Sequence, residues 1–311
     1  FGGGIWIPTS QLPVPPFNGT GATVSISDST ITGNTVTTHT AIPAGQFCPF
    51  ECGFANGGGI DNGGVLTLAN VRVTDNVAGA GSLASGVAAG GINSHFASTL
   101  LLLRTVVSGN RVVVGPPNGR DASSGGIASS GGLTIEDSSI SDNSVEFTGA
   151  NAEGDQVALA GGLEVGQCAP CGIPHPTATI RNTFITGNRA VATAADVDAV
   201  PAAFAGGLID DAPLLIERSV ISGNSARTVA AGAAAADGGG MEIDGTVTIR
   251  DSLVAHNSVV AEGNGPALAN GGGIANFGDL TLERTLVLAN SVTAHGAAGQ
   301  HPFGAPSLAI G

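Results

Sequence analysis

The chain has 311 residues and a net charge of −14, and its ten basic residues are all arginine. An acidic chain without basic clusters is a poor ligand for nucleic acids or anionic membranes, so neither is an expected partner. Glycine is unusually abundant at 50 residues, yet 42% of the residues are hydrophobic, which argues against disorder. No apolar run reaches the roughly 18 residues that a membrane helix needs, so no membrane insertion is predicted.

The predicted elements begin at a glycine cluster, Phe1-Gly-Gly-Gly-Ile5, with no signal peptide before it. We therefore expect a mature or trimmed piece of a longer protein. From there three kinds of short strand recur in fixed order. The first kind follows a glycine cluster, in the segments Gly57–Ile60, Gly90–Ile92, Gly125–Ile127, Gly161–Leu163, Gly206–Leu208, Gly238–Met241 and Gly271–Ile274.

The second kind of strand is an alternating triplet, as in Leu66-Thr-Leu68, Leu133-Thr-Ile135, Val247-Thr-Ile249 and Leu280-Thr-Leu282. The third kind ends in an aliphatic residue, two small or polar residues and an asparagine. These asparagines are Asn34, Asn76, Asn110, Asn143, Asn188, Asn224, Asn257 and Asn290, spaced by 42, 34, 33, 45, 36, 33 and 33 residues. Apolar residues at period two indicate strands, and a repeat of this length indicates a solenoid.

Three short strands per repeat predict an all-β parallel β-helix of about eight coils that forms one domain over residues 1–311. Coils stacked about 4.8 Å apart give a rod of roughly 40 Å. Like residues then become neighbours. We expect the asparagines to line an inward corner, where each amide bonds to the next asparagine and to turn backbone. The alternative is that asparagine serves only as a left-handed turn residue.

A column of charges is predicted on the outer face after the triplets. Aligned on the asparagines, it contains Glu136, Arg181, Glu217, Arg250 and Glu283, whose signs alternate. A neighbouring column, Arg218, Asp251 and Arg284, alternates as well. Opposite charges on adjacent strands attract, so these columns favour one register of stacking.

Segments rich in alanine, valine, glycine and threonine link each asparagine to the next glycine cluster, and we expect loops there, including Ala230–Ala236. Larger insertions are predicted at residues 6–21, 37–56 and 166–176. Two of them hold the cysteines, which favour local disulfides Cys48–Cys52 and Cys168–Cys171 in an oxidising compartment. The alternatives are free thiols, a redox pair, or a metal site with His39 and His175 as nearby ligands, although no metal site is predicted.

The two tetrads, Gly-Gly-small-aliphatic and aliphatic-x-x-Asn, resemble the repeats of polymorphic outer-membrane proteins over about residues 2–292. Those repeats carry Gly-Gly-Ala-Ile and Phe-x-x-Asn, whereas this chain has Ile or Val for Phe and often Gly for Ala. The resemblance implies a right-handed parallel β-helix, a secreted or surface-exposed adhesin-like rod, and no catalytic residue to carry over.

The leading functional hypothesis is therefore a non-enzymatic extracellular or cell-surface rod, structural or adhesive, whose ends stack into fibres or whose ligand is a surface polysaccharide. Its side could pair through an apolar stripe formed by Phe184, Val220, Leu253 and Leu286, unless alanine-rich loops cover that stripe. No catalytic residue, cofactor or metal is predicted under this hypothesis.

The alternative is a polysaccharide-active hydrolase or lyase. Its candidate catalytic acids are Glu164, Asp210, Asp211, Glu242 and Asp244, which follow glycine clusters in three successive coils and could gather on one face. Such carboxylates suit glycoside hydrolysis or Ca²⁺ binding. Against this, the Gly-His-Gly and Arg-x-Lys signatures common in hydrolases of this fold do not occur, and Arg218 is the nearest base for a lyase.

A minor alternative is ice binding through an outward column of Ser25, Thr67, Thr134, Thr179, Thr248 and Thr281, which Leu101 and Leu215 interrupt. Threonine is also common in strands for its shape alone.

Overall fold

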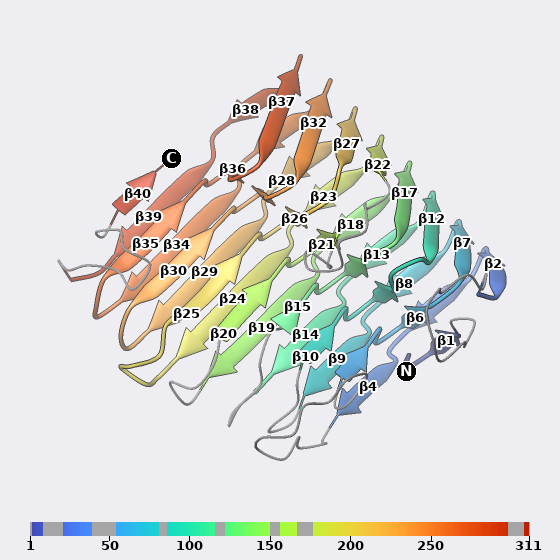
Figure 1. Ribbon diagram of the computed structural model, residues 1–311, viewed down its shortest axis with the longest axis horizontal. Coiled ribbons are helices and arrows are strands. Elements are labelled where there is room, and N and C mark those ends of the chain that lie inside the picture. The colour runs from blue at the N-terminus through green and yellow to red at the C-terminus, as the bar shows by residue number, and fades with distance from the viewer. Residues whose placement is uncertain are drawn as a thin grey trace.

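The protein is a parallel β-solenoid, and its described residues contain forty short strands in five parallel sheets of eight strands each. The computed structural model describes residues 2–8, 21–38, 54–80, 86–115, 122–149, 156–166, 177–297 and 308–310. Figure 1 shows the strands stacked coil upon coil, with the two chain ends at opposite ends of the stack. Within those residues no helix is long and apolar enough to cross a bilayer.

Each coil passes through the five sheets in the order A, B, C, D and E, and the next coil lies in register on top of it. Sheet A contains β1 (Ile5–Ile7), β6 (Ile60–Asn62), β11 (Ile92–Ser94), β16 (Ile127–Ser129), β21 (Leu163–Val165), β26 (Leu208–Asp210), β31 (Met241–Ile243) and β36 (Ile274–Asn276). Sheet B contains β2 (Thr23–Ser27), β7 (Val65–Ala69), β12 (Thr99–Leu103), β17 (Gly132–Glu136), β22 (Ala178–Arg181), β27 (Leu214–Glu217), β32 (Thr246–Arg250) and β37 (Asp279–Glu283). Sheet C contains β3 (Thr30–Thr32), β8 (Arg72–Thr74), β13 (Val106–Ser108), β18 (Ser139–Ser141), β23 (Phe184–Thr186), β28 (Val220–Ser222), β33 (Leu253–Ala255) and β38 (Leu286–Leu288).

The remaining two sheets come from the segments between the asparagines and the glycine clusters. Sheet D contains β4 (Thr35–Thr38), β9 (Val77–Ala80), β14 (Arg111–Val114), β19 (Ser144–Gly149), β24 (Arg189–Ala194), β29 (Ser225–Ala230), β34 (Ser258–Gly263) and β39 (Ser291–His295). Sheet E contains β5 (Phe54–Asn56), β10 (Gly86–Ala88), β15 (Ala122–Ser123), β20 (Gln156–Leu159), β25 (Pro201–Phe204), β30 (Ala234–Asp237), β35 (Ala267–Asn270) and β40 (Leu308–Ile310).

The prediction of three strands per coil is therefore wrong, because each coil has five. The expected loop Ala230–Ala236 instead contains the end of β29 and most of β30. These strands escape sequence reasoning because their buried face is alanine, as at Ala226, Ala234 and Ala236. Alanine differs little in hydropathy from the small residues around it, so the period-two signal is weak.

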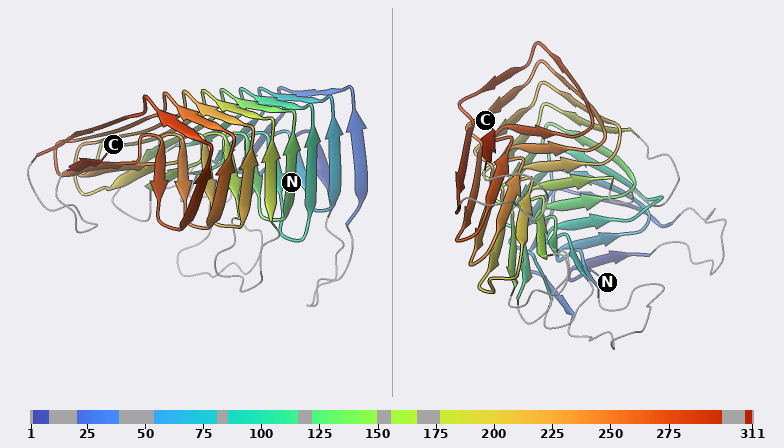
Figure 2. Two further views of the ribbon diagram at one scale, coloured as in Figure 1. Left: turned by 90° about the horizontal axis from the view of Figure 1, so that it is seen from above. Right: turned by 60° about the vertical axis from the view of Figure 1, so that its left-hand side comes forward.

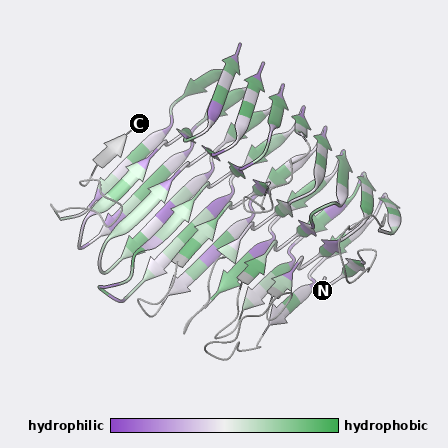
Figure 3. Cartoon of the chain, in the orientation of Figure 1, coloured by the Kyte–Doolittle hydropathy of each residue, from purple (hydrophilic) through white to green (hydrophobic). Residues whose placement is uncertain are grey.

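Two separate cores run the length of the stack. Large aliphatic side chains of sheets A, B and C, such as Ile180, Ile185 and Leu208, fill the first core. The second core lies between sheets D and E and is built mostly of alanine and valine, and its described members include the aromatic side chain of Phe147. Figure 2 shows the coils from two further directions, and Figure 3 shows the hydropathy of these strands. Small side chains let sheets D and E approach closely.

The predicted insertions fall largely outside the described residues. The described ends of two of them are strand rather than insertion, since Trp6 and Ile7 lie in β1 and Thr37, Thr38 and residues 54–56 lie in β4 and β5. The cysteine pairs Cys48–Cys52 and Cys168–Cys171, together with His39 and His175, lie outside the described residues.

Candidate functional site

The eight asparagines form one hydrogen-bonded ladder at the corner between sheets C and D. The backbone N–H and the Nδ2 of Asn188 both donate to Oδ1 of Asn224, each at 3.0 Å. The second Nδ2 hydrogen of Asn188 goes to the carbonyl oxygen of Ile140 in the preceding coil, also at 3.0 Å. The same set of bonds recurs from Asn76 to Asn257, all of which are buried. Each amide thus satisfies two donors and two acceptor sites.

The glycine pairs lie directly against this ladder. A β-carbon on Gly207 would lie 2.9 Å from the side-chain amide of Asn224, and one on Gly206 would lie 2.4 Å from the backbone of Ser225. The same contacts join Gly59 to Asn76 and Gly162 to Asn188. The segment entering sheet A therefore crosses the segment entering sheet D backbone to backbone. The two tetrads of the sequence are the two sides of one neck that separates the two cores.

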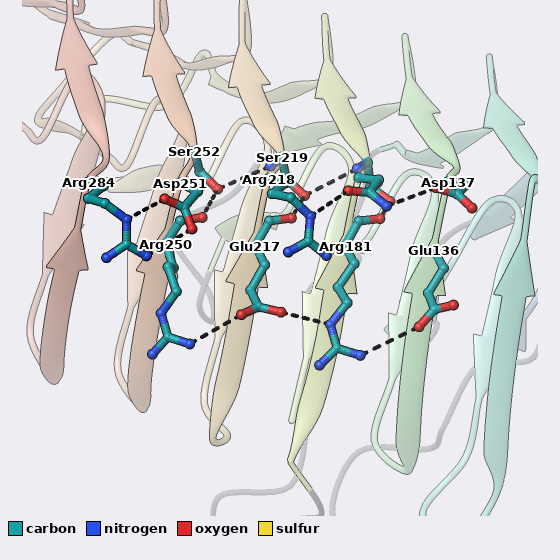
Figure 4. A network of polar contacts seen from close by, with 12 residues as sticks. Glu136, Asp137, Arg181, Glu217, Arg218, Ser219, Arg250, Asp251, Ser252 and Arg284 are labelled. Atoms are coloured by element: carbon teal, nitrogen blue, oxygen red, sulfur yellow. Dashed lines mark hydrogen bonds and ion pairs between the residues drawn. The ribbon is translucent and has the colours of Figure 1, made fainter.

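The alternating charges form a continuous column of ion pairs on sheet B, and Figure 4 shows its members Glu136, Arg181, Glu217 and Arg250. Arg181 lies 3.6 Å from Glu136 and 2.8 Å from Glu217, and Arg250 lies 3.2 Å from Glu217 and 2.7 Å from Glu283. The hydrogen bond from Arg181 is the main reason that the pKa of Glu217 lies below its usual value. Every interior member of the column thus contacts an opposite charge on both sides.

A second polar column occupies the turn between sheets B and C, where the backbone is left-handed. Its residues repeat the order acid, amide, base: Asp28, Asn70 and Arg104, then Asp137, Asn182 and Arg218, then Asp251 and Arg284. Asn182 donates to Asp137 at 3.0 Å, and Arg218 donates to Asn182 at 2.9 Å. Arg284 donates twice to Asp251, at 2.6 and 2.9 Å. Only the last three charges of this column were predicted, because asparagine carries no sign to alternate.

Sequence reasoning missed a third column, formed by the serine or threonine that follows these turn residues in every described coil except that of Asn70, where Val71 takes the position. The Oγ of Ser219 accepts from the backbone N–H of Thr183 at 3.2 Å and donates to the carbonyl of Glu217 at 2.8 Å. Thr105, Ser138, Thr183 and Ser252 are buried at equivalent positions. The signal was present as a serine or threonine after the turn residue in most repeats.

The five candidate catalytic acids do not share one open face. Glu164 and Glu242 occupy the same outward column of sheet A, separated by Ile209. Asp210 lies in the next column, between Val165 and Ile243, which belong to the first core. Its Oδ1 accepts from the N–H of Ala212 at 3.3 Å, whereas its Oδ2 is buried without a hydrogen-bond partner. The expectation of a common face is therefore wrong for Asp210, because its position has the opposite strand parity. Asp211 and Asp244 follow the strands, in the A–B turns.

Glu164 and Glu242 face outward and are still buried, because sheet E folds back toward sheet A. Between the end of its sheet E strand and the start of the next sheet A strand, the chain makes a left-handed turn, for example at Gly238 with φ 63°. We call this re-entrant angle the A–E corner. A hydrogen bond from Ser123 of β15 to Glu164 of β21 spans it. Asp237, which the sequence reasoning did not single out, lies at the end of β30 in the same corner and accepts from Asn270 at 2.7 Å.

Burial raises the pKa of four of these acids, Asp210, Asp237, Glu242 and Asp244. The pKa of Glu242 rises to about 9, first because of burial and then because of the charge of Asp237. Burial also raises the pKa of Asp210 to about 8 and that of Asp237 to about 6. The Oε2 of Glu242 is buried without a hydrogen-bond partner. Glu242 and Asp210 are therefore neutral at pH 7.

Asp61, Asn93 and His95 form another polar group in the A–E corner. The Nε2 of His95 lies 2.7 Å from Oδ1 of Asp61, which also accepts from Asn93 at 2.9 Å. Burial works to raise the pKa of Asp61, but the hydrogen bonds and charge of His95 and the bond from Asn93 outweigh it and leave the pKa below its usual value. Across the described ranges no group of three or more histidine, cysteine, aspartate or glutamate residues is arranged to hold a metal ion.

Two outward columns of hydroxyl residues lie on different sheets. The predicted column, which includes Thr134 and Thr179, runs along sheet B with its interruptions at Leu101 and Leu215. A second one on sheet C contains Thr32, Thr74, Ser108, Ser141, Thr186 and Ser222. The B–C turn separates the two columns, so they do not form one flat array.

The apolar stripe on sheet C is open to solvent. Phe184 and Leu286 are 55% and 57% exposed, and Val220 and Leu253 between them are partly exposed. The four side chains stand in register on β23, β28, β33 and β38. The expectation that alanine-rich loops cover the stripe is wrong, because those segments form sheets D and E.

Comparison with known proteins adds no relative: no family model, no curated protein and no solved structure matches this chain.

Proposed function

We propose that this protein is a non-enzymatic extracellular or cell-surface rod that serves a structural and adhesive role. The observation that carries the proposal is the set of polar columns that run along the coils. The asparagine ladder, the charge column and the turn column all make hydrogen bonds to the equivalent residue of a neighbouring coil. Side chains that are hydrogen-bonded between coils stiffen the stack, and their polar groups are not available to a substrate.

The resemblance to polymorphic outer-membrane protein repeats supports the same proposal. The structure gives both tetrads a common physical role at the neck, through the contacts of Gly207 with Asn224 and their equivalents. That resemblance adds two expectations, a right-handed coil and an adhesin-like role on the cell surface.

An adhesion assay tests this function. Beads coated with the purified protein are held under flow on immobilised neutral or acidic polysaccharides, with uncoated beads as the control. The net charge of −14 disfavours acidic polymers, so we expect retention on a neutral polysaccharide, insensitive to salt, and no release of reducing ends. Equal retention of coated and uncoated beads on every surface would contradict the adhesive role.

A second candidate function is cleavage of polysaccharides, and Asp237 and Glu242 favour it. Two neighbouring carboxyls with pKa values of about 6 and about 9 resemble an acid and base pair separated by their environments. However, the two side chains are only 8% and 7% exposed. Incubation with uronide polymers, with and without Ca²⁺, distinguishes the two functions. Turnover that is lost in Glu242→Gln and kept in Glu262→Gln, a change at an exposed ion-paired acid, would replace the rod proposal.

A further inference from the structure

The exposed stripe of sheet C borders the turn column, and together they form a surface with a repeating pattern. Moving along the stack, the stripe reads Phe184, Val220, Leu253 and Leu286. The turn residues of the same coils read Asn182, Arg218, Asp251 and Arg284, and all four are exposed. Isolated apolar side chains on a surface are ordinary, but four in register make a continuous apolar ridge about 15 Å long.

This surface is complementary to itself when one copy is reversed. A two-fold axis that lies in the surface, parallel to the strands and between Val220 and Leu253, reverses the order of coils and keeps each column opposite its own copy. Phe184 then faces Leu286 of the second copy, and Val220 faces Leu253. In the turn column Arg218 faces Asp251, and Asn182 faces Arg284. Every apolar residue meets an apolar residue, and the acid meets a base twice.

We propose that the sheet C face binds a second copy of this chain in an antiparallel, two-fold dimer, with reciprocal ion pairs between Arg218 and Asp251. The inference deepens the proposed rod function, since it gives the side-by-side contact of two rods. A parallel pair about an axis along the rod would instead place the turn column against the C–D corner, which in these coils is formed by Gly187, Gly223, His256 and Ala289. Neither Arg218 nor Arg284 would then face an acid. Like surfaces related by one two-fold axis are the usual basis of a closed dimer.

The dimer is a weak one. A stable interface buries about 800 Å² on each partner, and a ridge of four side chains is smaller than that. Association is therefore concentration-dependent, and it strengthens at low salt because the reciprocal ion pairs are exposed.

Sedimentation velocity over a hundredfold range of protein concentration measures the association. We expect the wild type to shift toward the dimer, and Val220→Glu, at the centre of the ridge, to weaken association at least tenfold. Thr248→Glu is the matched control, because it adds the same charge on the outer face of sheet B. A wild type that stays monomeric, or a dimer that Val220→Glu leaves unchanged, overturns the proposal. Circular dichroism spectra show whether each variant keeps its fold.

Mixing two charge variants tests the antiparallel arrangement. In a dimer of the Arg218→Asp variant, the new aspartate would face Asp251 of the other copy. In a dimer of the Asp251→Arg variant, the new arginine would face Arg218. Like charges repel, so we expect each variant alone to be monomeric. An equimolar mixture restores both pairs and forms a heterodimer. An effect within one chain cannot be rescued by mixing, so an unchanged mixture overturns this geometry. The assay contains no polysaccharide, and retention of Val220→Glu beads under flow reports separately on adhesion.

Discussion

At the scale of single residues, the bonds of the buried asparagines explain why all eight repeats carry asparagine at this position. Aspartate lacks the two N–H donors, and a left-handed turn residue such as glycine lacks the amide altogether. The turn conformation itself is adopted by the residue before each asparagine, for example Gly223 and His256. The ladder bonds of Asn224 therefore favour the first of the two interpretations raised for this position, the inward corner.

Removing one rung tests the value of the ladder. Asn188→Ala leaves the two N–H donors of Asn143 without an acceptor and the carbonyl of Ile140 without its donor. We expect a loss of about 3 kcal/mol or more in the free energy of unfolding, measured by urea denaturation, because the groups are buried. The control is Asn182→Ala, whose amide is exposed, with an expected loss below about 0.5 kcal/mol. Equal losses in the two variants would mean that the ladder bonds contribute no more to the free energy of unfolding than an exposed amide does.

The buried acids make stability depend on pH. The folded pKa values of Glu242, Asp210 and Asp237 are raised, so the folded state holds more protons than the unfolded state. Stability is therefore greatest near pH 4 to 5 and is lost as pH rises toward the folded values. For Glu242 alone the loss at pH 7 is about 3 kcal/mol. The lowered pKa values of Asp61 and Glu217 act in the opposite direction, below about pH 4.

Urea denaturation at pH 5, 7 and 8.5 measures this dependence. Glu242→Gln is expected to raise the free energy of unfolding at pH 8.5 and to flatten the slope, since glutamine stays neutral. Glu146→Gln, at an exposed acid, serves as the control and should follow the wild type. A wild-type protein that is more stable at pH 8.5 than at pH 5 would show that these acids are not neutral in the folded state.

At the scale of elements, the charge column acts through its alternation more than through any one pair. Ion pairs at the surface each contribute less than about 1 kcal/mol. The side chain of Glu217 is partly buried, but both of its arginine partners reach solvent, so Glu217→Gln should lower stability only modestly. Glu217→Arg should lower the melting temperature further, because it places a third base between Arg181 and Arg250. Glu136→Arg meets only Arg181 and should cost about half as much. Melting temperatures at low and high salt measure the series, and added salt should reduce the differences; a Glu217→Arg penalty independent of salt would exclude charge repulsion as its cause.

The glycine pairs make a second prediction about elements. Gly207→Ala forces a β-carbon to within 2.9 Å of Asn224 and should destabilise the protein by several kcal/mol or prevent folding. Gly79→Ala in β9 is the matched control, because its nearest new contact is 3.6 Å away. Alanine there should be neutral or slightly stabilising, by about 0.5 kcal/mol. Thermal unfolding followed by circular dichroism compares the two, and a tolerated Gly207→Ala would refute the close crossing at the neck.

At the scale of the whole molecule, each coil depends on its neighbours for burial. Val254 is fully buried between two coils, whereas Val287, its equivalent in the outermost described coil of sheet C, is 42% exposed. A stack in which every coil contacts only its neighbours unfolds from its least supported coils.

Hydrogen exchange should reveal that gradient. Amides of the coils that contain Asn143 and Asn188 are expected to exchange slowest, and those near Asn290 fastest, although the local sequences are alike. Exchange measured by mass spectrometry over hours gives the order. A uniform rate along the stack would instead indicate one cooperative unit.

The sequence by itself determined the register of this protein. Because stacked coils place like positions side by side, the recurrence of asparagine and the alternation of Glu217 with Arg250 were enough to predict a parallel β-solenoid, its asparagine ladder and its charge column. It also marked Phe184 and Leu286 as outward residues, since strand parity is local.

Only the tertiary structure decided how the coil closes. In the alanine-rich strands of sheets D and E, the inward and outward residues differ too little in hydropathy for the strands to be recognised from sequence. Their burial depends on a partner sheet that comes from elsewhere in the coil. The same fold-back buries the outward acid Glu242 and brings Asp237 beside it, whereas Asp210 lies inside the first core. Whether an outward-facing side chain is exposed to solvent depends on the packing between sheets, and no local sequence pattern encodes that packing.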